Sequence, residues 1–342
     1  MSEKNVILKV RNLSTSFVSD GREVRIVKNV SFDVKRGKTL AIVGESGCGK
    51  SVTMNSILRL LGRNAKVTAD KIDFYEKMPD GDMKIHHINE FKKPNGKEMN
   101  FLRGQKISMV FQDPMSSLDP VYRVGDQVME GLREHCKISK KEARERTLEI
   151  FKKLGIPDPE KRMNCYPYEF SGGMKQRVVI AIAIICNPDL IICDEPTTAL
   201  DVTIQAQIMD ILQDLQDTLG ISIVMITHNM GLVAQMASEV CVMYMGRIVE
   251  KGAAEDIFDH PCHPYTQALL KSVPVLGMSG EKELATIPGA TPNPAELKDG
   301  CEFADRCSYC TEACRSGEIP VYEISAGHTV RCIRAGQQEV TS

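Results

Sequence analysis

A glycine-rich segment early in the chain combines the residue types that bind phosphate. Residues 44–51 fit the pattern G-x-x-x-x-G-K-[ST] and lie between a short apolar run and a helical stretch. Glycines allow several backbone N–H groups to converge on one phosphate at a helix N-terminus. The Lys50 ammonium can then reach the β- and γ-phosphates, and the Ser51 hydroxyl can bind Mg²⁺. The predicted ATP-binding loop consists of Gly44, Glu45, Ser46, Gly47, Cys48, Gly49, Lys50 and Ser51.

Two adjacent acids end an apolar run further along the chain. Residues 190–195 read Leu-Ile-Ile-Cys-Asp-Glu, the pattern of a short buried strand. Successive strand side chains point to opposite faces, but a turn at the strand end can bring both carboxylates near one γ-phosphate. Asp194 is the expected outer ligand of Mg²⁺, and Glu195 is the expected base that orients the attacking water.

Two polar side chains that end or follow other predicted strands could complete this site. Gln112 follows the apolar run at 107–111 and could add an oxygen ligand to Mg²⁺ or to the water. His228 follows the strand predicted over 221–226 and could contact the γ-phosphate. A lone histidine is usually a surface or satisfied core residue, so both assignments depend on the phosphate loop.

A second glycine pair precedes the two acids. The segment Phe170-Ser171-Gly172-Gly173-Met174 opens a helical run. Ser171 suits the N-cap position, and the two glycines leave backbone N–H groups exposed for an anion. Alone, the motif would indicate only the start of a helix. Beside a phosphate loop and a metal-binding strand, it indicates that two chains close on one ATP.

Alternating strands and helices position these motifs. Strands are predicted over 6–10, 24–34, 40–43, 107–111, 190–193 and 221–226, helices over 51–61, 124–154 and 202–219, and a hairpin over 240–250. This alternation around a phosphate loop predicts an α/β fold with a mostly parallel, helix-covered sheet. Residues 66–98 hold many charges and two turn signals, so we expect an exposed, hairpin-like excursion. A Pro- and Gly-rich linker is predicted near 274–294.

Composition limits the class of protein. A chain of 342 residues can bury a large core and hold more than one domain. The net charge of −2 gives no reason to expect nucleic-acid binding. The sequence has no apolar run long enough to span a membrane and no signal-peptide pattern at its start. We therefore expect a cytoplasmic protein whose membrane role, if any, comes through a partner.

Five of the twelve cysteines lie between Cys301 and Cys332. In a reducing compartment, such a cluster suggests metal or cofactor ligation more than disulfides. Cys310 lies close in sequence to both Cys307 and Cys314, which is the spacing of zinc sites. Four thiolates also suit a [4Fe–4S] cluster. Zinc, an iron–sulfur cluster and unligated thiols are the three alternatives.

These motifs together have the order and rough spacing of an ABC transporter ATPase. More closely, the chain resembles the ATPase subunits of bacterial oligopeptide and dipeptide permeases, a group that includes nickel importers. The matching segments are Gly44–Thr53, Phe111–Pro120, Glu169–Arg177, Asp194–Gln207 and His263–Pro274. The resemblance implies a P-loop cassette over 1–260, with an antiparallel β subdomain and a helical subdomain at about 113–186. It also implies a small cysteine-rich C-terminal domain over 261–342.

The resemblance also implies how residues act across a dimer. Two ATPase subunits would pair head to tail, so the signature Ser171–Met174 would serve the partner's ATP and Asp201 would link the two sites. Phe17 resembles the aromatic residue that stacks on adenine, with Glu23–Val27 as rival contacts. The form with Phe170 and with Met174 in place of the common glutamine resembles one of two non-identical subunits, which implies a heterodimer.

The function implied is ATP hydrolysis that energises import of dipeptides or oligopeptides across the cytoplasmic membrane. The cofactors would be ATP, Mg²⁺ held by Ser51, Gln112 and Asp194, and a [4Fe–4S] cluster. The four cluster ligands would be Cys301, Cys307, Cys314 and Cys332. The partners would be a second ATPase subunit, two transmembrane permease subunits and, indirectly, an extracytoplasmic solute-binding protein.

Other functions share parts of this pattern. The ATPase of a nickel or other small-solute importer would have the same nucleotide site. A soluble ABC ATPase acting on DNA or ribosomes would also share it, but those proteins usually fuse two cassettes or insert a long coiled coil, and this chain has neither. A regulatory or metal-sensing module would explain only the cysteine tail.

Overall fold

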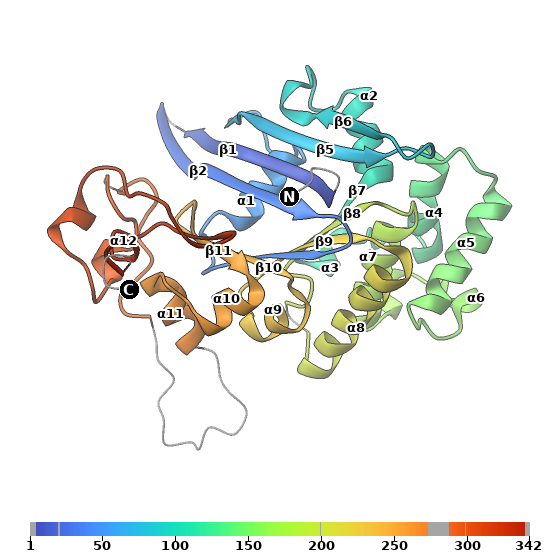
Figure 1. The fold of residues 1–342 in the computed structure, drawn as a ribbon. Coiled ribbons are helices and arrows are strands. Elements are labelled where there is room, and N and C mark those ends of the chain that lie inside the picture. Colours follow the sequence, from blue (N-terminus) through green and yellow to red (C-terminus); the bar gives the residue numbers. More distant parts are fainter. Residues whose placement is uncertain (1–4, 20, 199, 273–286, 298, 339–342) are drawn as a thin grey trace. The chain divides into compact units, whose positions relative to one another are not determined.

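The chain folds into two compact units, each built from distant parts of the sequence. The computed structural model describes residues 5–19, 21–198, 200–272, 287–297 and 299–338. One unit contains residues 1–7, 34–38 and 74–225, and the other contains residues 8–33, 39–73 and 226–342. The predicted linker over 274–294 lies outside the described residues as far as position 286, and so does Ala199. Figure 1 traces the helices and strands along the chain.

The first unit contains the strand that carries the two acids. Its strands, in whole or in part, are β5 (Lys71–Lys77), β6 (Met83–His87), β7 (Ile107–Val110), β8 (Leu190–Asp194) and β9 (Ser222–Thr227). β8 lies between β7 and β9 and pairs in parallel with β7, with Ile107 opposite Leu190. Parallel pairing of short strands, of which β8 is fully buried, confirms this part of the predicted α/β fold.

Helices make up most of the remainder of the first unit. They are α2 (Lys97–Phe101), α3 (Pro114–Ser117), α4 (Val124–His135), α5 (Lys140–Lys153), α6 (Pro159–Arg162), α7 (Gly172–Ile184) and α8 (Val202–Leu219). The predicted helix over 202–219 is confirmed by α8. α7 is buried over most of its length, which explains its largely apolar sequence between Val178 and Ile184.

The helical stretch predicted over 124–154 is confirmed except for a break between residues 136 and 139. The structure has two helices, because the chain leaves the helical conformation at Lys137, whose φ is 52°. Ser139 then caps α5, and its hydroxyl accepts a hydrogen bond from the Glu142 N–H at 3.2 Å. Apolar spacing continued across the break because both helices bury a face, so the periodicity alone did not reveal it.

The exposed excursion predicted over 66–98 is also wrong in part. The five central residues of β5, Ile72–Glu76, are buried. Glu76 is accommodated there because one carboxylate oxygen lies 2.8 Å from His86 Nε2 and the other lies 2.9 Å from Lys106 Nζ. A buried charge persists when it is paired and hydrogen-bonded, so charged composition did not imply exposure.

The second unit contains the phosphate loop and the cysteine-rich region. Its strands are β1 (Val6–Ser19), β2 (Arg22–Lys35), β3 (Thr39–Val43), β4 (Ala65–Thr68), β10 (Glu239–Tyr244), β11 (Arg247–Ala253), β12 (Tyr322–Ser325) and β13 (His328–Val330), with the ends of β1 and β2 in the first unit. β3 pairs in parallel with β10, and β10 and β11 form the predicted hairpin. β13 then pairs with β11, so a strand from the chain's end extends this sheet.

One hydrophobic core joins these strands to the C-terminal region. The helices of this unit are α1 (Lys50–Ile57), α9 (Met230–Met236), α10 (Ala254–Asp259), α11 (Pro264–Lys271) and α12 (Ala335–Gln338). Val43, Tyr244, Tyr265 and Phe303 lie in the same buried cluster. The Tyr265 and Phe303 rings lie 5.4 Å apart, centre to centre. The described part of the cysteine-rich region therefore packs on the strands beside the phosphate loop.

Candidate functional site

The phosphate loop joins β3 to α1, and its glycines are required by the backbone. Gly44, Gly47 and Gly49 all have positive φ values, of 152°, 78° and 101°. A side chain at Gly44 would also collide with the Met243 carbonyl oxygen. The Lys50 ammonium donates to the carbonyl oxygens of Gly44 and Glu45 at 2.8 and 2.9 Å. These two bonds hold the Lys50 side chain against the loop whose backbone N–H groups would bind phosphate.

Cys48 of this loop points into the protein. Its side chain is buried, and burial raises the pKa of its thiol. The Cys48 carbonyl accepts a hydrogen bond from the Gly246 N–H at 2.8 Å. The neutral thiol therefore fills space beneath the loop, and Cys48 can face a nucleotide only through its backbone.

The two acids lie at a sharp turn in the first unit. Asp194 ends β8 and is buried, and Glu195 follows with φ of 46°, a left-handed value that non-glycine residues rarely adopt. The Gln112 amide donates to Glu195 Oε2 at 3.0 Å, and the Thr198 hydroxyl donates to the same oxygen at 2.9 Å. The structure thus brings Gln112 and Glu195 together and adds Thr198 to the set.

The second glycine motif begins α7. The Ser171 hydroxyl accepts a hydrogen bond from the Met174 N–H at 3.4 Å, as expected of an N-cap. Ser171 and Gly172 are exposed, whereas Gly173 is buried and a Cβ there would lie 2.8 Å from Ile204 Cγ2. Gly173 therefore packs between α7 and α8. Ser171 and Gly172, at the exposed start of the motif, are accessible to a ligand.

The remaining predicted site residues are distributed between the units. Asp201, in the first unit, caps α8, and its carboxylate accepts a hydrogen bond from the Ile204 N–H at 2.9 Å. Phe17 lies partly exposed on β1 opposite Ala65, and His228 is exposed just after β9, both in the second unit. The predicted roles of all three residues stay predictions.

Four cysteines of the C-terminal region line one cavity of about 220 Å³. They are Cys301, Cys307, Cys314 and Cys332, and their neighbours in the wall include Phe303, Tyr309 and Ile319. Cys310 is not among the lining residues. The Cys301 N–H donates to the Cys314 carbonyl at 2.8 Å, which fixes two of the four segments together.

Burial governs the protonation of these thiols. It raises the pKa of Cys301 to about 12 and also raises the pKa of Cys307. Both thiols therefore stay protonated at neutral pH unless a metal replaces the proton. The cavity volume of about 220 Å³ is several times the roughly 30 Å³ of a water molecule, so there is room for more than one small ion.

Glu250 is a buried polar centre that the sequence did not reveal. It is fully buried on β11, and its carboxylate accepts hydrogen bonds from the N–H groups of Cys262 and His263 at 2.7 and 3.0 Å. His328 Nε2 lies 2.9 Å from the same carboxylate. Glu250, Cys262 and His328 have the ligand types of a metal site. The three nitrogen contacts instead satisfy the carboxylate, so we interpret Glu250 as the residue that ties β13 and the start of α11 to β11.

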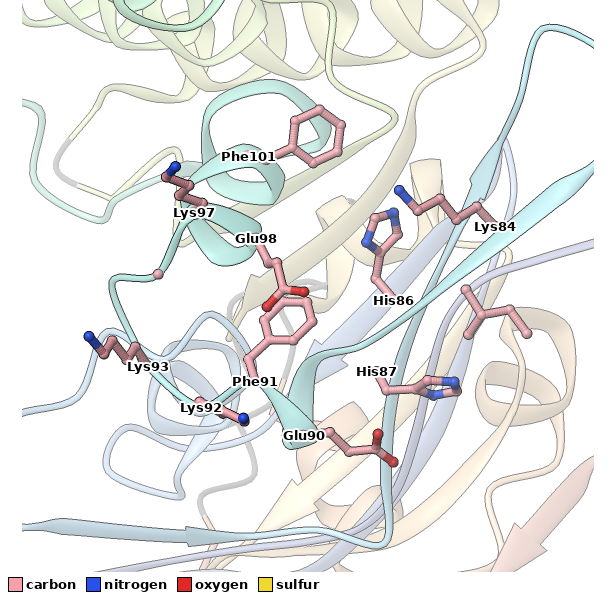
Figure 2. A pocket seen from close by; sticks show the side chains of 12 residues that line it. Lys84, His86, His87, Glu90, Phe91, Lys92, Lys93, Lys97, Glu98 and Phe101 are labelled. Carbon is pink, nitrogen blue, oxygen red and sulfur yellow. The ribbon is translucent and has the colours of Figure 1, made fainter.

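A cavity of about 850 Å³ lies beside β6 and α2 in the first unit. Its lining includes four lysines, but in Figure 2 the ammonium groups of Lys84, Lys92, Lys93 and Lys97 lie apart around the rim. His86, which faces the cavity, is already paired with Glu76. The lysines therefore do not converge on one anion.

Known proteins resemble this chain over nearly its whole length. Residues 27–198 match the family model described as "ABC transporter", and residues 249–314 match "Oligopeptide/dipeptide transporter, C-terminal region". The dipeptide transport ATP-binding protein DppD of Bacillus subtilis is 48% identical over 328 residues, which cover 95% of this chain and 94% of that protein. The oligopeptide transport ATP-binding protein OppD of the same organism is 47% identical over 329 residues, which cover 95% of this chain and 88% of that protein.

Solved structures agree with these relatives. A dimeric ATP-binding cassette, MJ0796, in a post-hydrolysis state bound to ADP and Pi, matches with a TM-score of 0.60 at 27% identity. The match covers 72% of this chain and 99% of the cassette. Among the described residues, none of the helices combines the length and apolar character needed to cross a membrane.

Proposed function

This chain belongs to the ABC transporter family, in the group of oligopeptide and dipeptide import ATPases, and from that premise we propose how its residues divide the work. It is an ATP-hydrolysing subunit that energises peptide import through a membrane transporter. The observation that carries this function is the match to named peptide importers over 95% of the chain, together with a phosphate loop of the required geometry.

Hydrolysis of this chain's own ATP depends on the phosphate loop, on ligands for Mg²⁺ and on a base. The loop at 44–51 binds the phosphates through its amides and Lys50, while Ser51, Gln112 and Asp194 hold Mg²⁺. Glu195 accepts the proton of the attacking water. The hydrogen bonds that Gln112 and Thr198 donate to Glu195 support this role, because they fix the orientation of its carboxylate. His228 contacts the γ-phosphate, and Phe17 stacks on adenine.

The α7 motif serves the ATP of a second subunit. Exposed N–H groups at the start of a helix favour an anion, and Ser171 and Gly172 are exposed there. Asp201 then links the two sites across the interface.

Met174 supports a non-identical partner, so the assembly contains a heterodimer of ATPases. Two membrane permease subunits and a solute-binding protein complete the importer, and the ATPases lie on its cytoplasmic face.

The cysteine cavity holds a [4Fe–4S] cluster. The position of Cys310 supports the cluster over a single zinc ion. Cys310 does not line the cavity, so the closely spaced cysteine pairs typical of zinc sites are not available there, whereas four cysteines do line it. When bound, such a cluster would join four short segments through Fe–S bonds. Anaerobically purified protein should contain iron and absorb near about 400 nm. Zinc without iron, or no metal at all, would refute this assignment.

The cargo is a dipeptide or an oligopeptide, and the membrane subunits and binding protein select it. The chain divides into a cassette over 1–260, with its helical part near 113–186, and a C-terminal region over 261–342.

Affinity purification of the full chain from its native membrane tests the assembly. We expect two permease subunits and a second ATPase to copurify, and peptide should stimulate ATP turnover of the reconstituted importer. Stimulation by nickel alone would favour the small-solute alternative, and recovery with ribosomes or DNA would contradict transport.

A further inference from the structure

An arginine of the cysteine-rich region contacts the phosphate loop. Arg306 Nη1 donates to Glu45 Oε2 at 2.6 Å, and Arg306 Nη2 donates to Glu45 Oε1 at 3.0 Å. This two-bond geometry is the strongest form of an arginine–carboxylate pair. Glu45 is the second residue of the loop, and 261 positions separate it from Arg306 in sequence. The pair therefore joins the ATP-binding loop to the segment that enters Cys307.

The guanidinium of Arg306 is fixed by contacts other than Glu45. Its Nε donates to the Pro288 carbonyl at 2.8 Å, and Nη1 lies 3.3 Å from the Tyr244 hydroxyl. The guanidinium carbon also lies 5.9 Å from the ring centres of both Tyr244 and Phe303. Only 6% of the side chain is exposed. Since Arg306 is held from several sides, it determines where the Glu45 carboxylate lies.

The backbone of Glu45 is held from the same region. Its N–H donates to the Tyr265 hydroxyl at 2.8 Å, and its carbonyl accepts from Lys50 at 2.9 Å. Tyr265 lies on α11 and packs against Phe303, close to the turn that carries Arg306. Residues downstream of the cassette strands thus determine the conformation at the start of the phosphate loop.

An unpaired carboxylate at Glu45 would oppose nucleotide binding. ATP brings several negative charges to this loop, and like charges within a few ångströms repel most strongly where water is partly excluded. The Glu45 side chain is 25% exposed, so solvent would screen that repulsion only in part. A purely structural ion pair would matter for folding alone, whereas a neutralising pair would also change the affinity for ATP.

We propose that Arg306 is a positioning residue for the phosphate loop, which neutralises Glu45 and holds it in place so that the loop accepts ATP. The proposal rests on the proposed function only in that residues 44–51 bind ATP. It gives the cysteine-rich region a part in nucleotide binding that acts through Glu45.

The same region offers a matched control. Arg315 pairs with Asp305 at 2.6 Å, but both side chains are largely exposed, at 51% and 86%. Neither residue of this exposed pair has a hydrogen bond to the phosphate loop among the contacts of the described residues. Arg315→Gln therefore removes the same charge from the same region without touching Glu45.

The test measures the Kd of Mg·ATP and the thermal midpoint of full-length protein. We expect Arg306→Gln to raise Kd about tenfold, since it leaves a carboxylate in the loop unpaired. Adding Glu45→Gln to that variant should restore Kd to within about threefold of wild type, because the repelling charge is gone. Arg306→Lys keeps the charge and should lose about threefold or less, and Arg315→Gln should bind as wild type does.

Several results would overturn the proposal. A folded Arg306→Gln protein with wild-type Kd would show that the pair is structural only. A double variant that binds as weakly as the single one would exclude neutralisation. If Arg306→Gln does not fold, a tenfold loss in folded Arg306→Lys would contradict the role of charge. A wild-type chain that fails to bind ATP would instead refute the proposed function.

Discussion

The phosphate loop and the segment that carries Asp194 and Glu195 position their functional groups in different ways. The loop presents backbone groups, and its conformation depends on glycines such as Gly44, where no side chain fits. The acid segment presents a side chain, Glu195, which is held by hydrogen bonds from Gln112 and Thr198. Binding therefore depends on backbone shape, whereas hydrolysis depends on the placement of one carboxylate.

This difference predicts which substitutions separate binding from hydrolysis. A change in the loop backbone should weaken both, because ATP that is not bound is not hydrolysed. A change around Glu195 should lower turnover and leave ATP affinity nearly unchanged.

The largest effect on ATP affinity should come from Gly44→Ala. The new methyl group would collide with the Met243 carbonyl, so the loop must shift. We expect ATP affinity to fall by about tenfold or more, which corresponds to about 1.4 kcal/mol or more, and turnover to fall with it. Gly47→Ala is the matched control, since its Cβ would meet nothing within 4 Å and only its φ of 78° opposes the change. Equal losses in the two variants would argue against the collision.

A smaller effect should follow from Gln112→Ala. The substitution removes one hydrogen bond to Glu195, and such a bond to a charged group contributes about 1.5–3 kcal/mol, less where solvent is present. We expect turnover to fall about tenfold at saturating ATP, with the Kd of ATP without Mg²⁺ unchanged. Thr198→Val removes the second bond to the same oxygen and should behave similarly. A loss confined to ATP affinity would show that these residues do not act through Glu195.

The smallest effect on ATP turnover should follow from changes at the cysteines. Cys301→Ser removes a thiol that lines the cavity, so iron content should fall by at least half. Cys310→Ser should leave iron content unchanged, because Cys310 is not among the lining residues. Iron analysis and visible absorbance of anaerobically purified protein measure both outcomes. Equal iron loss in the two variants would contradict the four-cysteine assignment.

How much the sequence revealed depends on whether a feature is local. The phosphate loop, α8 and the β10–β11 hairpin follow from short patterns, because glycine conformations and helical spacing act over a few residues. Burial of β5 did not follow, since it depends on Glu76 meeting His86 and Lys106. The break between α4 and α5 was hidden because apolar spacing continues across it.

The candidate site shows the same limit. The motif residues were identified from sequence, but the hydrogen bond between Gln112 and Glu195 joins residues 83 positions apart. The pair formed by Glu45 and Arg306, and the three contacts of Glu250, have no local signal at all. Each requires the tertiary fold to bring distant segments together.

The most direct test of the separation between binding and hydrolysis is one measurement on Glu195→Gln. The substitution keeps the size of the side chain and removes the base, which typically contributes about 10²–10⁴-fold in rate. We predict a Kd for Mg·ATP within about threefold of wild type and single-turnover hydrolysis at least about 100-fold slower. Near-wild-type hydrolysis in a variant that binds ATP normally would contradict the account.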